Sequence, residues 1–223
     1  RARRRGRRRH LITKRPTVQR RTLLLGAGAA LIGGKAQASA VITADDIVLG
    51  DANAPVTLIE YASTTCPTCA AFHAALWEPL RARYIDSGRV RLAFREFPTP
   101  PEAIALAGFQ IARCRNATPE QYIARVGELF RQQQAIFTET TMAGVLRRLV
   151  AIGEGFGLTA TEVNAAINDR SGAERIRRIA EGAETFHIHG TPSFVINGQR
   201  YEGPLSGRDL FGALDAAGSQ AAP

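Results

Sequence analysis

Two strand-like segments flank a helical pattern early in the chain. Residues 56–59 read Val-Thr-Leu-Ile, which fits a buried strand, and residues 90–97 alternate between apolar and polar side chains until Pro98 stops them. Proline is favoured in the first turn of a helix, so Pro67 opens a helix between these strands, and Gly88 ends this unit. The pattern predicts a strand, a helix and a second strand in succession.

A long helical block follows this unit. From residue 102 to about residue 187, apolar positions recur at helical spacing, and no segment alternates like a strand. Thr118, Thr159 and Ser171 each precede a Gln or Glu by three residues. This is the spacing of a capping box, in which two side chains satisfy the free backbone N–H groups of a helix start. We therefore expect helices to start at these three positions.

A strand pattern returns near the carboxyl end. Residues 190–199 predict a strand that ends in an Asn-Gly turn, which favours a tight hairpin to Tyr201. A last amphipathic helix is expected from Ser206 onward.

Positive charge is concentrated at the amino terminus. The chain has 223 residues, with 29 Lys and Arg against 20 Asp and Glu, and a formal net charge of +9. Residues 1–40 hold 12 of the basic side chains and no acidic one, so the remaining 183 residues carry a net charge of −3. A body of that charge lacks the positive field that nucleic-acid binding requires, so we expect no nucleic-acid partner.

The first 40 residues have the features of an export signal. A basic run precedes the apolar residues 23–34, and two overlapping Ala-x-Ala patterns at residues 36–40 suit a signal peptidase. The pair Arg20-Arg21 favours a twin-arginine signal slightly over general secretory export. A disordered basic arm that binds nucleic acid and an uncleaved membrane anchor are the alternatives.

The candidate chemistry lies at Cys66-Pro67-Thr68-Cys69. Residues three apart in the first turn of a helix share one face, at a separation that a disulfide can span. A sulfur at a helix amino terminus faces free N–H groups and the positive end of the helix dipole, and both favour the thiolate. We therefore expect Cys66 to be the attacking sulfur and Cys69 the resolving one.

Other uses of the cysteines stay open at this point. The pair could hold zinc, with His73 as a third ligand, or form a permanent disulfide, although closing so short a loop gains little. Cys114 follows an apolar helical run and is expected to be a buried structural residue. His187 and His189 are expected to pack or to face solvent. No Gly-rich phosphate loop occurs, and we expect neither a metal nor a cofactor.

Two strings of sequence resemble a known family. Residues 57–73 read TLIEYASTTCPTCAAFH, and residues 189–198 read HGTPSFVING. With the helical block between them, they resemble the thioredoxin-fold family of disulfide-bond protein A (DsbA) over residues 45–218. The resemblance implies an α/β thioredoxin fold with an inserted all-helical domain.

The resemblance also implies a domain order and a function. A thioredoxin domain of residues 41–98 and 188–218 is interrupted by a helical insertion at residues 99–187 and followed by a tail at residues 219–223. The implied protein is a monomeric periplasmic thiol:disulfide oxidoreductase without a bound cofactor. Its partners are exported proteins, held through a mixed disulfide, and a membrane redox protein that recycles it.

The resemblance implies roles for individual residues. Cys66 is the exposed nucleophile and Cys69 the buried cysteine. Pro192 matches the family's cis-proline, which faces the cysteine pair. Thr191, just before it, matches the residue whose backbone pairs with the substrate peptide. A cis X-Pro bond exposes the preceding backbone for such strand-like pairing.

Glu60 occupies the place of the family's buried acid. A carboxylate beneath the active site is costly to bury in its ionised form, which suits it to exchange a proton with the resolving thiol. The alternative is a surface Glu at a strand end. Arg95 is expected either beside Glu60 as a counter-charge or exposed to solvent.

Thr68 departs from the family pattern. Pro67 and Thr68 are expected to contact substrate, but the best-known members carry His in place of Thr68, where a positive imidazole helps hold the thiolate. We therefore expect Cys66 to be less acidic than the thiol of DsbA, whose pKa is about 3.5. The redox couple is expected between about −120 mV for DsbA and about −270 mV for thioredoxin.

These features define one function and two alternatives. We interpret the chain as an exported oxidoreductase that donates or exchanges disulfides through its Cys-Pro-Thr-Cys site. Thr191 is shared with related isomerases and reductases, so a periplasmic reductase or isomerase is the first alternative. The second is a noncatalytic thioredoxin-like module that binds metal or protein.

Overall fold

The computed structural model describes residues 42–221. The export signal expected at residues 1–40, the start of the expected thioredoxin domain at residue 41 and the last two residues of the tail lie outside this range. Within the described range, no helix combines the length and the apolar content that crossing a membrane requires.

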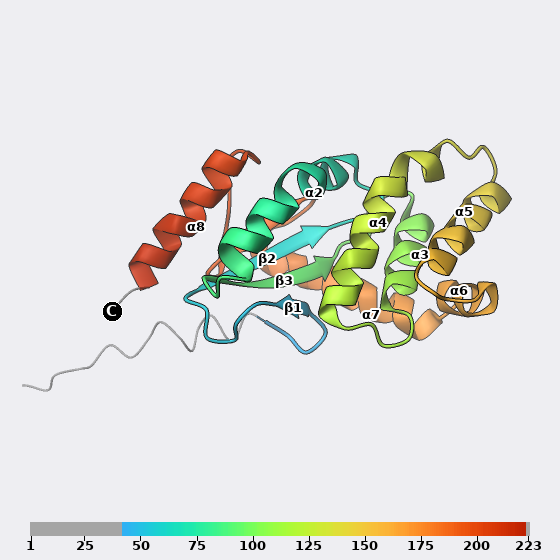
Figure 1. Cartoon of the computed structure of the whole chain (residues 1–223), viewed down its shortest axis with the longest axis horizontal. Coiled ribbons are helices and arrows are strands. Elements are labelled where there is room, and N and C mark those ends of the chain that lie inside the picture. Colours follow the sequence, from blue (N-terminus) through green and yellow to red (C-terminus); the bar gives the residue numbers. More distant parts are fainter. Residues whose placement is uncertain (1–41, 222–223) are drawn as a thin grey trace, which may run out of the picture. The chain divides into compact units, whose positions relative to one another are not determined.

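Among the described residues, five strands form one sheet in the order β1-β3-β2-β4-β5. The strands are β1 (Ile47–Leu49), β2 (Val56–Ala62), β3 (Val90–Glu96), β4 (Ser193–Ile196) and β5 (Gln199–Arg200). Strands β2 and β3 lie side by side and are parallel (Figure 1). The other three pairs are antiparallel. All of β2 is buried, because elements cover both faces of the sheet there. The three strand regions and the hairpin expected from the sequence pattern are confirmed.

Helix α2 (Pro67–Leu80) connects the parallel strands β2 and β3. A parallel pair requires such a crossover. Pro67 occupies the first helical position, which confirms the predicted start. Pro79 lies in the last turn, and a π-helical turn (Arg81–Ile85) follows it. Gly88 then leads into β3 with a φ of 73°, a conformation that glycine adopts at little steric cost.

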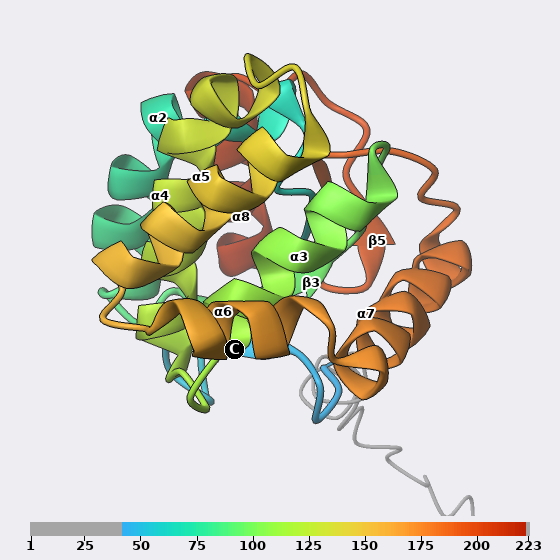
Figure 2. The same cartoon turned by 90° about the vertical axis from the view of Figure 1, so that its right-hand side faces the viewer.

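The described chain between β3 and β4 contains helices and no strand, as expected. Its elements are α3 (Glu102–Arg113), α4 (Pro119–Phe137), α5 (Met142–Gly155), α6 (Ala160–Ile167), α7 (Arg170–Glu181) and a 3₁₀ turn (Gly182–Phe186). Helix α4 packs against α2, and α3 and α5 pack on α4 (Figures 1 and 2). Helix α7 returns along β3 and so closes the helical block against the sheet.

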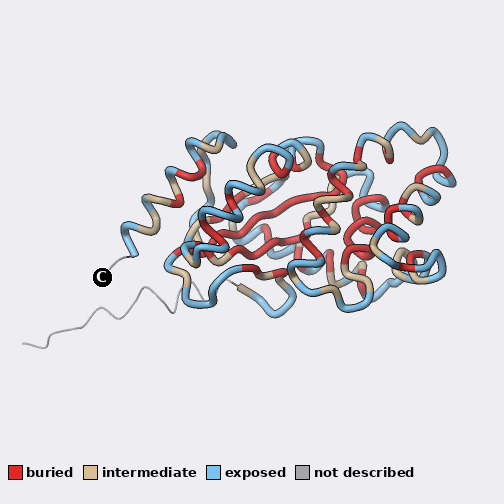
Figure 3. The backbone as a smooth tube through the Cα atoms, viewed as in Figure 1, coloured by how far each residue is buried: buried red, intermediate tan, exposed pale blue. Residues whose placement is uncertain are grey.

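Different elements cover the two faces of the sheet. Helices α2 and α8 (Gly207–Ala221) pack on the face that carries Leu58 and Leu92. Ala183 and Ile188, after α7, cover Ile59 and Tyr61 on the other face. Figure 3 shows burial concentrated in the central strands and along the inner sides of the helices. The apolar side predicted for the last helix is confirmed by its buried residues, Leu210, Phe211 and Leu214.

Two of the three predicted capping boxes are confirmed. Thr118 and Thr159 each accept a hydrogen bond from the third helical residue, whose side chain accepts one in return from the cap backbone. The box predicted at Ser171 is wrong. Asp169 caps α7 instead, and its carboxylate accepts a hydrogen bond from the backbone N–H of Ser171. Asp is as good a cap as Ser, and here it lies two residues earlier in the chain.

A buried ionic network joins the end of β3 to the helical block. Arg113 of α3 donates to both carboxylate oxygens of Glu96, at 2.7 and 2.9 Å. The hydroxyl of Tyr122, on α4, donates to the same carboxylate at 2.8 Å. Glu96 is fully buried, so these bonds replace the water that its charge would otherwise need.

Candidate active site

The loop after β2 places Cys66 at the start of α2. Cys66 is the N-cap residue, and its Sγ accepts a hydrogen bond from the backbone N–H of Cys69 at 3.2 Å. Capping positions normally carry a side-chain oxygen that accepts from the same backbone group. The sulfur therefore replaces a capping oxygen, and a charge on it would face the free N–H groups of the helix.

Cys66 is less exposed than the family resemblance implied. Only 7% of its surface is accessible, whereas Pro67 and Thr68 beside it are exposed. The covering group is the loop before β4, where the Cys66 thiol donates to the carbonyl oxygen of Thr191 at 3.3 Å. The peptide bond between Thr191 and Pro192 is cis, as predicted. The structure thus brings Cys66 and the loop of the cis-proline together.

The two cysteines have opposite electrostatic environments. A hydrogen bond from the side chain of Cys69 is the main cause that lowers the pKa of Cys66 to about 6, against an ordinary value of 9.0. The Thr191 side chain and the backbone N–H groups of Thr68 and Cys69 lower it further, while burial opposes them. Burial is the main cause that raises the pKa of Cys69. The two shifts have the directions that an attacking and a resolving thiol require.

The pKa of Cys66 also bears on the departure at Thr68. The pKa of Cys66, about 6, is higher than that of the DsbA thiol, which is about 3.5, and lower than that of a free cysteine. A less acidic thiol than that of DsbA is what the replacement of His by Thr predicts. The stabilisation of the Cys66 thiolate comes first from the side chain of Cys69, and then from Thr191 and the backbone N–H groups at the cap position.

Gln133, on α4, supports the active-site loop, and sequence analysis did not find it. Its side-chain amide donates to the carbonyl of Thr64 at 2.8 Å and to the carbonyl of Cys66 at 3.1 Å. Gln133 is buried between Phe130 and Ile136, which are also buried on α4. A buried glutamine needs hydrogen-bond partners. The position of Gln133 among the apolar residues of this helical pattern is therefore the sequence signal that indicates such a role.

Glu60 is fully buried, so the alternative of a surface Glu is wrong. One carboxylate oxygen, Oε1, lies 2.8 Å from Nε2 of His73, which is also buried. The imidazole of His73 stacks on Trp77 with ring centroids 5.2 Å apart and contacts Phe130 of α4 at 4.7 Å. His73 therefore pairs with the carboxylate instead of joining the cysteines as a zinc ligand.

Both expectations for Arg95 are wrong. It is buried, and its guanidinium donates to both oxygens of Asp46 at 2.8 and 2.9 Å and to the Tyr61 hydroxyl at 2.7 Å. In the parallel register Arg95 is opposite Tyr61, and its neighbour Phe94 is opposite Glu60. Successive side chains of a strand point to opposite faces, so Arg95 and Glu60 lie on different faces of the sheet.

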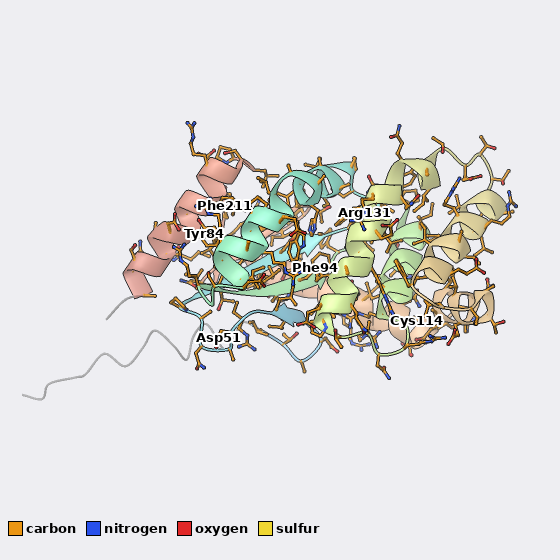
Figure 4. The ribbon with its side chains drawn as sticks, viewed as in Figure 1. Asp51, Tyr84, Phe94, Cys114, Arg131 and Phe211 are labelled. Carbon is orange, nitrogen blue, oxygen red and sulfur yellow. The ribbon has the colours of Figure 1, made fainter. Side chains whose placement is uncertain are left out.

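The remaining candidate residues lie apart from the cysteine pair. Cys114 follows α3 as its C-cap, among the helices of the insertion (Figure 4). It packs against the hydrophobic core but is only half-buried, so it is less buried than expected. His187 and His189 are exposed. Among residues 42–221, no three His, Cys, Asp or Glu side chains are arranged to hold a metal ion.

The fold and this site agree with a family of known proteins. The family model described as Thioredoxin matches residues 43–216. The chain belongs to the thioredoxin family.

Curated relatives and solved structures refine the comparison. A protein of Rickettsia prowazekii, provisionally named a protein-disulfide oxidoreductase, is 30% identical over 71% of this chain and 56% of its own length. The chain thus spans about half the length of the curated relatives it matches. Wolbachia pipientis alpha-DsbA1 is 24% identical with a TM-score of 0.71, covering 83% of this chain and 96% of that chain. BdbD of Bacillus subtilis is 17% identical with a TM-score of 0.66, and the match covers 78% of this chain and 94% of that chain. The predicted thioredoxin fold with a helical insertion, as in DsbA, is confirmed.

Replacing Gln133 with Ala is expected to destabilise the chain by about 1 to 3 kcal/mol, because two buried carbonyls lose this donor. Urea unfolding of the reduced chain, followed by circular dichroism, measures the loss. Gln134→Ala is the matched control, since Gln134 is the next residue on α4 and is exposed; its effect should stay within about 0.5 kcal/mol. Equal effects of the two substitutions would contradict the role of Gln133.

The thiolate absorbance of the reduced chain at 240 nm is expected to rise with a midpoint near pH 6. Cys69→Ala should move this midpoint upward, because it removes the donor that lowers the pKa of Cys66 most. Cys69→Ser, which keeps a hydroxyl donor, should move it less. Cys114→Ala is the control and should leave it unchanged. A midpoint that stays near pH 6 in Cys69→Ala would show that the other hydrogen bonds are sufficient.

The same pKa sets the sign of a stability effect. The pKa of Cys66 is lower in the folded chain than its ordinary value of 9.0 in an unfolded one, so folding favours the thiolate. This contribution should be complete above about pH 9 and be lost as the pH falls through about 6. Urea midpoints of the reduced chain should therefore show a greater rise over this range than those of Cys66→Ala.

Proposed function

We propose that this chain is a thiol:disulfide oxidoreductase that introduces or exchanges disulfide bonds in exported proteins through Cys66 and Cys69. The asymmetry of the pair carries the proposal: the pKa of Cys66 is lowered to about 6, while burial raises that of Cys69. Disulfide exchange needs one thiolate that attacks or leaves readily, and a partner that stays protonated until it is used. The names of the relatives, which include protein-disulfide oxidoreductase and DsbA, agree with this chemistry.

Disulfide donation would proceed in two exchanges. A substrate thiolate attacks Sγ of Cys66, the bond to Cys69 breaks, and the electron pair leaves on the Cys69 sulfur, which takes up a proton. A second substrate thiolate then attacks the substrate sulfur of the mixed disulfide, which forms the substrate disulfide and releases Cys66 as a thiolate. The lowered pKa of Cys66 stabilises that released thiolate and so favours donation. No bound cofactor is needed, and a membrane redox protein would reoxidise the pair.

Substrate would bind beside the loop of the cis-proline. Thr191 lies just before β4, and its carbonyl is 3.3 Å from the reactive sulfur. An extended peptide can pair with backbone groups in such a position, as strands do when they join a sheet edge. Pro67 and Thr68 are exposed on the other side of Cys66, where they would contact the same peptide.

Glu60 would exchange a proton with the resolving thiol. Cys69 and His73 are one helical turn apart on α2 and are both buried, and Glu60 pairs with His73. Residues four apart on a helix are neighbours on one face, so the carboxylate lies on the side of α2 to which Cys69 belongs. A carboxyl group there can take or supply the proton that buried Cys69 cannot exchange with bulk water.

A periplasmic location would follow from the export signal expected at residues 1–40, and we propose that the chain acts there as a monomer. A reductase or isomerase is the second candidate function. The pKa of Cys66 supports this second function. At about 6, it is closer to the thiol pKa of thioredoxin, about 7, than to that of DsbA, about 3.5.

Equilibrium titration of the full chain in glutathione buffers tests the direction of electron flow. For a disulfide donor we expect a reversible two-electron couple above about −180 mV, because such a couple exceeds the oxidising power of the isomerases. Alkylation and mass spectrometry read the thiols, and Cys114→Ala is a control that should not move the couple. A value near −250 mV or lower would support a reductase instead, and the lack of a reversible couple would disprove the redox function.

Cys69→Ser is expected to accumulate long-lived mixed disulfides with exported proteins, because the sulfur that resolves them is missing. Nonreducing electrophoresis of cell extracts, before and after a thiol reductant, measures this trapping. Cys66→Ser is the matched control and should trap nothing. If the two variants behave alike, the chain is a noncatalytic binding module.

A further inference from the structure

A cleft of about 610 Å³ lies between α2 and α4, outside the substrate-binding surface proposed above. His73 and Trp77 of α2 and Phe130 and Arg131 of α4 contribute to its lining. Figure 4 shows Arg131 on α4, the helix that packs against α2. A cleft of this size holds many water molecules, since one water takes about 30 Å³.

His73 is the link between this cleft and the buried carboxylate. The side chain of His73 is 5% exposed and lines the cleft, whereas the side chain of Glu60 has no exposed surface. The two groups share a hydrogen bond of 2.8 Å. The second carboxylate oxygen, Oε2, is buried and has no hydrogen-bond partner among the described residues. Any proton that reaches Glu60 from the cleft would therefore pass through His73.

The resolving cysteine lies on the same helix as His73. Cys69 and His73 are four residues apart on α2, which places them one turn apart on the same face. Cys69 has no exposed surface, so its proton has no direct contact with water. A substrate bound at Cys66 would also cover the open side of the site.

We propose that His73 carries protons between Glu60 and the water of this cleft, so that Cys69 can gain or lose its proton while a protein substrate is bound. The inference rests on the proposed function and adds the path by which protons enter and leave. Imidazole is suited to this task because it gains and loses a proton near neutral pH and has two ring nitrogens. His73 acts through Glu60 and does not touch the reacting sulfurs.

The proton balance holds in both directions. When Cys69 resolves a mixed disulfide, its proton passes to Glu60, then to His73, and then to water in the cleft. The Cys69 sulfur forms the bond to Cys66, and the substrate sulfur leaves with the electron pair. When the chain donates its disulfide, Cys69 leaves with the electron pair and receives a proton by the reverse path.

Charged groups of both signs surround the path. On the side of α2, the cleft is lined by Glu78, Arg81 and Asp86, and on the side of α4 by Glu120 and Arg131. Arg81 and Asp86 pair with each other at 3.3 Å. Groups of opposite charge therefore line the cleft on both of its sides.

The test uses the full chain and a small disulfide that cannot block the cleft. Reduced chain is mixed with oxidised glutathione, and quenched samples are analysed by mass for the glutathione adduct at Cys66 and for its resolution by Cys69. His73→Gln keeps a hydrogen bond to Glu60 but cannot carry a proton. At pH 7 we expect this variant to resolve the adduct about 10- to 100-fold more slowly and to form it at the parent rate. The rate of resolution should also depend less on pH, and should change less when D₂O replaces water.

Two further variants separate proton transfer from structure. His189→Gln removes an exposed histidine and should resolve the adduct at the parent rate. In His73→Ala, the cleft has room for free imidazole, which should restore resolution in proportion to its concentration and should leave His73→Gln unaffected.

Three results would overturn the inference. Resolution at the parent rate in His73→Gln at every pH from about 5 to about 8, the range in which histidine changes its charge, would disprove the proton path and leave the proposed function intact. Equal slowing of both steps, or the lack of imidazole rescue, would show that His73 has only a structural role. If the parent chain forms the adduct but never resolves it, the proposed function fails together with the inference.

Discussion

The position of one sulfur at the start of α2 determines most of the chemistry of the site. Sγ of Cys66 accepts the backbone hydrogen bond that a capping oxygen normally accepts, so the need to cap a helix also stabilises a thiolate. Burial of the same sulfur beneath the Thr191 carbonyl opposes this effect. The side chain of Cys69 lowers the pKa of Cys66 most, and the capping N–H groups lower it further; with burial opposing them, the pKa is about 6. The depth of Cys69, one turn further on, raises its own pKa and makes the pair asymmetric.

The helical insertion takes part in this arrangement. Helix α4 supplies Gln133, whose amide holds the carbonyls of Thr64 and Cys66, and Phe130, which packs on the ring of His73. The ionic network around Glu96 fixes α3 and α4 to the end of the neighbouring strand. Movement of the insertion relative to the sheet would therefore change the loop that carries the reactive sulfur.

The sequence predicted what local signals determine. The β-branched strand, Pro67 at the helix start and the Asn-Gly hairpin are read within a few residues, and all three are confirmed. Contacts between distant residues were missed. Gln133 meets its carbonyl partners 69 and 67 residues away, and Arg95 meets Asp46 49 residues away, so neither partner leaves a local pattern. At α7 two good local caps competed, and the choice of Asp169 over Ser171 depends on where the helix begins.

Burial of the resolving cysteine has two consequences that belong together. Removing Cys69 from water raises its pKa, which keeps it protonated and lets Cys66 be the thiolate. The same removal separates Cys69 from the solvent that would otherwise exchange its proton. A site that gains asymmetry in this way needs an internal group to move that proton, and an acid as deep as Glu60 faces the same difficulty. In the proposed proton path, the hydrogen bond between Glu60 and a histidine that lines the cleft would meet both needs.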